Sequence, residues 1–240
     1  MRRMNPYQKL QNRKRKWTPV QTTAGPLVEG AEETIFRALA MRHMELPVGD
    51  FIFDALKTEV PETARELLQS NITDEENHDI ALGYIANAIG TNDRAEQEAK
   101  RIRDAWIAHP DHTVLKAMVA ERAIFFVLLP FFRFNGDAGL RTVSADISRD
   151  EQIHVAANSL VCRELGLVVS PSLDKLRKAT INWVMQPLGT SSNKYLDKKF
   201  WLNASDRLMY EGKAPELSET KRARMPAFFE HANPNLPQYA

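Results

Sequence analysis

One pattern of possible metal ligands occurs twice in the sequence. Each copy is a glutamate followed thirty residues later by a Glu-x-x-His segment. On a helix, a spacing of three places the carboxylate and the imidazole on one face, within reach of a single ion. The six residues are Glu45, Glu75 and His78 in the first copy, and Glu121, Glu151 and His154 in the second.

Four carboxylates and two imidazoles from four helices match the ligand set of a ferritin-like di-iron or di-manganese site. Carboxylates suit divalent iron and manganese and can bridge two ions, and one imidazole per ion completes the set. The sequence therefore predicts two transition-metal ions as the cofactor: Fe/Fe, Mn/Fe or Mn/Mn.

At two places the same residues also fit a simpler, non-metal interpretation. The segment Thr73–Glu76 also fits a capping box that starts a helix. Glu45 lies near a possible helix kink at Pro47, where it could be merely solvent-exposed. Glu121 is harder to dismiss, because it lies in the apolar stretch 118–129, where an unpartnered buried carboxylate would be costly.

Few glycines (10 in 240 residues) and apolar positions spaced by three and four predict an all-α protein. Long helices joined by short connections favour a ferritin-like helical bundle. The expected helices cover residues 31–58, 61–90, 93–108 behind Asn92, 111–134 behind Asp111, 138–166, 171–186, 192–212 and 217–231.

The first 30 residues differ in composition from the rest. A basic run, Arg13–Lys16, precedes a segment rich in turn formers at 18–26. We expect residues 1–30 to form an extended basic N-terminal arm and residues 31–240 to form the bundle. The basic run fits a solvated stretch better than a nucleic-acid contact. The other histidines are predicted to be surface or capping residues; they are His43, His109, His112 and His231.

Composition excludes several classes of protein. With 43% hydrophobic and 26% charged residues, the chain is neither disordered nor collagen-like, and a net charge of +1 provides no general attraction for nucleic acid or membrane. Cys162 is the single cysteine, which excludes an internal disulfide and a thiolate metal site. The longest apolar stretch, 123–132, is interrupted by Pro130 and is too short to span a bilayer. A cytoplasmic location is expected.

Several motifs resemble one family. Arg149–His154 has the form Arg-Asp-Glu-x-x-His and resembles the second metal-binding helix of class I ribonucleotide reductase small (beta) subunits. Glu121–Phe126 is similar to the preceding helix, Trp17–Pro19 to a Trp-x-Pro motif of the arm, and Asn233–Pro237 to a late Asn-Pro motif. The resemblance runs from Trp17 to Pro237 and is strongest over residues 118–154.

This resemblance implies a ferritin-like bundle, usually a homodimer, whose dimetal cluster reacts with oxygen and passes an oxidant to a large (alpha) subunit. The implied transfer route is Trp17, Asp150 and His78, with Tyr239 as a possible tail tyrosine. The alternative interpretation is that Asp150 is an exposed charged residue on a helix. Phe125 is implied to line the metal pocket.

The sequence departs from the family at the position of the usual radical tyrosine, four residues after the first histidine, where it has Leu82. Tyr84 should face away, because it lies about 240° around the helix from His78. The chain is also short for the family. Either the cluster itself is the oxidant, or the protein is a stand-alone dimetal oxidase or oxygenase acting on a small molecule. A ferritin-like storage or scaffold protein is a third possibility.

Overall fold

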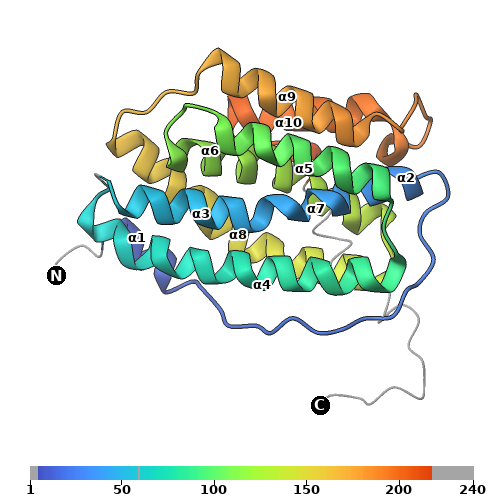
Figure 1. Cartoon of the computed structure of the whole chain (residues 1–240), viewed down its shortest axis with the longest axis horizontal. Helices are drawn as coiled ribbons and strands as arrows, with labels where there is room; N and C mark the ends of the chain where they lie inside the picture. The colour runs from blue at the N-terminus through green and yellow to red at the C-terminus, as the bar shows by residue number, and fades with distance from the viewer. Residues whose placement is uncertain (1–4, 59, 218–240) are drawn as a thin grey trace.

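The computed structural model describes residues 5–58 and 60–217, which are mostly helical and contain no strand. The predicted all-α bundle is confirmed (Figure 1). The α-helices are α1 (Pro6–Gln11), α2 (Glu32–Ala40), α3 (Glu45–Leu56), α4 (Arg65–Ile89), α5 (Asp93–Ala108), α6 (Thr113–Ala120), α7 (Phe126–Asn135), α8 (Ala138–Glu164), α9 (Pro171–Met185) and α10 (Lys198–Glu211).

Four helical segments form the centre of the bundle. Helix α3 packs against α4 and α6, and α8 packs against α4, α6 and α7, which closes a ring around a shared interior. Helices α9 and α10 pack together on one side, and α5 contacts α2 and α9. No helix in the described ranges is both long and apolar enough to cross a membrane.

Local capping explains several of the helix starts. Asn92 accepts a hydrogen bond from the Ala95 N–H at the start of α5, as the sequence predicts, and Asp137 accepts one from Leu140 at the start of α8. The expected start of the 111–134 helix was wrong by two residues. His112, not Asp111, caps α6, and the Asp111 carboxylate accepts from the Ser170 N–H instead.

The expected continuous helix over residues 31–58 is broken immediately before Glu45. Helix α2 ends at Ala40, a 3₁₀ turn covers Met41–Met44, and α3 starts at Glu45. Pro47 has no N–H to donate, so it is tolerated in the first turn of a new helix but not in a helix interior. The break therefore precedes the proline and makes Glu45 the first residue of α3.

Between α6 and α7 the chain makes a π-helical turn, Glu121–Phe125, where the Phe126 N–H donates to the carbonyl of Glu121. This i to i−5 bond accommodates one extra residue in the turn, and such turns occur often at functional sites. Sequence periodicity predicted one helix here, and the helical path is continuous, but the turn resets the side-chain directions after Glu121.

The N-terminal segment is not extended throughout. Residues 6–11 form α1, because Pro6 occupies the first helical position and the Asn5 side chain accepts from the Tyr7 N–H. Residues 14–28 have no regular secondary structure and run along the bundle beside α4 before turning to α2 (Figure 1). The basic run is not simply solvated, because Lys14 pairs with Asp74 and Arg15 with Asp146.

Some sequence predictions lie outside the described residues. These are the helix at 217–231 beyond its first residue, His231, the Asn233–Pro237 motif and Tyr239.

The buried Asp137 side chain joins the arm to the bundle. Its Oδ1 caps α8, and its Oδ2 accepts a hydrogen bond from the Gly25 N–H at 2.9 Å. We predict that Asp137→Ala lowers the free energy of unfolding by about 2 kcal/mol, because it removes a cap and leaves a second donor unpaired. Asn92→Ala, which removes one exposed cap, should cost about 1 kcal/mol. Urea denaturation of the metal-free protein measures both, and equal losses would show that the bond to Gly25 contributes nothing.

Candidate metal centre

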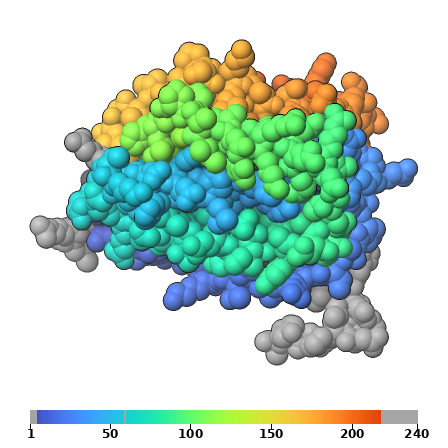
Figure 2. All heavy atoms as spheres, viewed as in Figure 1, coloured from blue at the N-terminus to red at the C-terminus, as the bar shows by residue number. Residues whose placement is uncertain are grey.

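The structure brings all six predicted ligands into one buried cluster inside the ring of α3, α4, α6 and α8. Each of the six is at most 1% exposed. Glu45 comes from the first turn of α3, Glu75 and His78 from α4, Glu121 from the π-helical turn, and Glu151 and His154 from α8. Figure 2 shows the face made by α3, α4 and α5 as a continuous surface of side chains, which is consistent with this burial.

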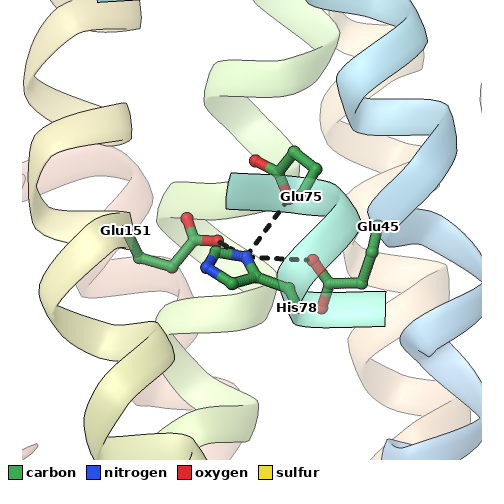
Figure 3. Close-up of side chains that lie close together, drawn as sticks. All are labelled: Glu45, Glu75, His78 and Glu151. Atoms are coloured by element: carbon green, nitrogen blue, oxygen red, sulfur yellow. Dashed lines mark ion pairs between the residues drawn. The ribbon is translucent and has the colours of Figure 1, made fainter. Parts of the chain in front are cut away.

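The first group of ligands surrounds the Nδ1 atom of His78. This nitrogen lies 3.4 Å from Glu75 Oε2, 3.4 Å from Glu151 Oε1 and 3.7 Å from Glu45 Oε2. Figure 3 shows the three carboxylates converging on the imidazole from three different helices. One ligand atom from each of the four residues lies within 4.8 Å of all the others, close enough for small side-chain movements to bring all four onto one metal ion.

The second group surrounds the Nδ1 atom of His154. Glu75 Oε1 lies 2.9 Å from this nitrogen, and Glu121 Oε1 and Glu151 Oε1 each lie 3.9 Å from it. Glu75 therefore directs one oxygen to each imidazole and belongs to both groups. The ring centroids of the two histidines are 5.7 Å apart. A carboxylate placed in this way can bridge two ions.

The buried atoms of the cluster fit a pair of cations better than they fit one another. Both oxygens of Glu45, Glu75 and Glu151, one oxygen of Glu121, and both Nδ1 atoms make no hydrogen bond of acceptable geometry within the described chain. Unpaired buried carboxylates are costly. Two divalent ions would balance the charge of four carboxylates beside neutral imidazoles, so the donor set fits a dimetal centre.

Without cations, burial and mutual repulsion disfavour the charged form of most carboxylates in the cluster. Burial raises the pKa of Glu45, Glu121 and Glu151, and neighbouring carboxylates raise it further. Burial would also raise the pKa of Glu75, but the two histidines outweigh it and hold that pKa below its usual value. Cations that bind here displace the protons that such a cluster retains.

A second layer of residues orients the first imidazole. The Trp17 Nε1–H donates to Asp150 Oδ2 at 2.6 Å, and the same oxygen lies 3.4 Å from His78 Nε2. The Trp17 and His78 rings are stacked, with centroids 6.2 Å apart. Asp150 is 1% exposed, so its alternative reading as a surface charge is wrong. A carboxylate on Nε2 leaves Nδ1 directed toward the metal position.

The second imidazole has a matching partner that sequence reasoning missed. His154 Nε2 lies 2.9 Å from Asp74 Oδ2, and Lys14 Nζ lies 2.6 Å from that same oxygen. Burial would raise the pKa of Asp74, but His154 and Lys14 outweigh it and lower that pKa. The signal was present in the sequence, because Asp74 precedes Glu75 as Asp150 precedes Glu151.

Asn158 is a further residue of the site that the sequence did not reveal. Its Nδ2 donates to Glu121 Oε2 at 2.7 Å. On α8 it lies seven residues after Glu151, and Leu82 holds the equivalent position on α4 after Glu75. Leu82 and Phe125, the predicted pocket residues, are both buried.

The structure also decides between the alternative interpretations of the remaining candidate residues. Thr73 lies in the middle of α4, so the Thr73–Glu76 segment does not cap a helix, and Glu45 is buried rather than exposed. His43 bonds to Glu96, His109 ends α5, and His112 caps α6, all outside the cluster. No hydrogen bond or ring contact joins any tyrosine of residues 5–58 and 60–217 to the six ligands.

Comparison with protein-family models, with curated proteins and with solved structures gave no match to this chain.

We predict that Glu121→Ala prevents binding of two ions, because it removes the carboxylate that belongs to the second group alone. His112→Ala should keep the metal content of the unchanged protein, because His112 caps α6 and contacts no ligand. Metal analysis after anaerobic loading with Fe²⁺ or Mn²⁺ measures the effect, with circular dichroism to verify that both variants fold. Equal metal content in the two variants would contradict the assignment of Glu121.

Proposed function

We propose that this protein is the small (beta) subunit of a class I ribonucleotide reductase. In this proposal a dimetal-carboxylate cluster and oxygen generate an oxidant that passes to a large (alpha) catalytic subunit, and the protein acts as a cytoplasmic homodimer. The observation that carries the proposal is the chain of contacts from Trp17 through Asp150 to His78.

These contacts connect the outer side of the bundle with the cluster. Trp17 lies on the N-terminal segment outside the helical ring and is only partly buried, whereas His78 is fully buried. An indole is one of the few side chains that can lose an electron reversibly. An enzyme that uses its oxidant on its own small substrate needs no such connection, but a subunit that exports an oxidant does.

The residues of this connection have distinct chemical roles. When bound, the two metal ions supply the one-electron chemistry with oxygen that no side chain here can supply alone. An indole that loses an electron becomes a stronger acid, and Asp150 Oδ2 already accepts the Trp17 N–H, so it can receive that proton. His78 Nε2 shares this oxygen, which holds the ring orientation that directs Nδ1 toward the carboxylates.

A second candidate function is a stand-alone dimetal oxidase or oxygenase. Leu82 supports it, because an apolar side chain fills the position one turn after His78 where the family usually stores its radical on a tyrosine. The contact of Trp17 with Asp150 argues for the reductase, since a self-contained oxygenase has no use for it.

Loss of the connection should abolish nucleotide reduction without loss of metal. We predict that Trp17→Phe and Asp150→Ala reduce product formation with the cognate large subunit to background, whereas Tyr84→Phe keeps full activity. Metal content of each variant is measured in parallel, and only variants that hold two ions are compared. Full activity in Trp17→Phe would contradict the proposal, and oxidation of a small molecule without a large subunit would favour the second candidate.

The oxidant should not reside on a tyrosine near the cluster. Leucine cannot be oxidised at potentials that a phenol reaches, and Tyr84 is outside the ligand cluster. Paramagnetic resonance after oxygen exposure of the metal-loaded protein should therefore show no tyrosyl radical at Tyr84. A stable tyrosyl signal that disappears in Tyr84→Phe would overturn this expectation.

A further inference from the structure

One short piece of the N-terminal segment lies behind both imidazoles of the cluster. Trp17 contacts the aspartate that holds His78, and Lys14 contacts the aspartate that holds His154. The two arrangements are alike in geometry but differ in charge. A neutral indole N–H supports one histidine, and an ammonium group supports the other.

Lys14 is held firmly at this place. Its side chain is 11% exposed, and Nζ donates to Ser70 Oγ at 2.7 Å and to Asn71 Oδ1 at 3.0 Å as well as pairing with Asp74. Because Lys14 and His154 share Asp74 Oδ2, the ammonium group offsets the negative charge that would otherwise act on the imidazole.

The ligands themselves differ little between the two positions. Glu75 and Glu151 approach both imidazoles, Glu45 approaches His78, and Glu121 approaches His154. In the second group, Asn158 also occupies one oxygen of Glu121. The charge of Lys14 and the hydrogen bond from Asn158 therefore act in the same direction, against a cation in the second position.

We propose that Lys14 makes the two metal positions unequal, so that a first divalent transition-metal ion binds beside His78 and a second binds more weakly beside His154. Lys14 is a positioning and charge-tuning residue that acts through Asp74 rather than as a ligand. This inference rests on the dimetal centre of the proposed function. Unequal positions would fill in order, which allows two different metals to occupy one centre.

The size of the effect follows from the charge and its distance. The ammonium group is separated from the second position by two hydrogen bonds and one imidazole ring, and the first position lies farther away, since the two ring centroids are 5.7 Å apart. Coulomb repulsion acts on both ions and falls with distance, so removal of the charge should tighten the second ion about fivefold more than the first. Asp74 then acts on His154 without an opposing charge, which strengthens the imidazole as a donor.

Anaerobic calorimetric titration of the metal-free, full-length protein with Mn²⁺ tests the proposal. The unchanged protein should bind two ions in two separate steps. Lys14→Met, which removes the charge and keeps the length of the side chain, should tighten the second step about fivefold more than the first. Lys14→Arg, which keeps the charge, should retain both steps. Lys16→Met is the matched control, because Lys16 is exposed and loses the same charge without touching Asp74.

Every outcome of this titration either supports or contradicts the role of Lys14. A tighter second step in Lys14→Met alone supports the proposal. An unchanged or weaker second step, equal changes in both steps, or the same shift in Lys16→Met would overturn it. Binding of two ions without an effect of Lys14→Met would leave the dimetal centre and the proposed function standing, whereas failure to bind Mn²⁺ at all would remove the centre itself.

Discussion

The burial of four carboxylates and two imidazoles in an apolar interior is the constraint on which the rest of this structure depends. Each buried carboxylate carries a large desolvation cost, and the carboxylates repel one another. The four surrounding segments must therefore hold the groups close enough together to share cations. The break before Glu45 and the π-helical turn at Glu121 both occur where a ligand glutamate enters this interior.

The N-terminal segment lies behind the ligands and contacts the residues that orient them. It contributes no ligand, yet Lys14 and Trp17 contact the two aspartates that hold the two histidines. The twofold pattern therefore holds for the ligands and the two aspartates but not for the residues that contact those aspartates. Asp74 is contacted by the ammonium group of Lys14, whereas Asp150 is contacted by the indole of Trp17. Functional asymmetry in a nearly symmetric centre arises from the segment that wraps the bundle, not from the helices that form it.

Sequence spacing was sufficient for the six ligands, because the helical period alone places Glu75 with His78 and Glu151 with His154. It was sufficient for the start of α5, where the predicted cap Asn92 is a local signal. It was insufficient for Lys14, which the basic run presented as solvated, because its partner Asp74 is 60 residues away in the chain. The break before Glu45 was also missed, since Pro47 is compatible with either a kink or a new first turn.

Anomalous X-ray diffraction from crystals of the protein loaded with Mn²⁺ would locate directly any ions held by the six buried ligands. We predict two anomalous peaks per chain inside the ring of α3, α4, α6 and α8, with Glu75 between them and each histidine bound through Nδ1. A single peak, a peak outside this ring, or coordination through Nε2 would contradict this prediction.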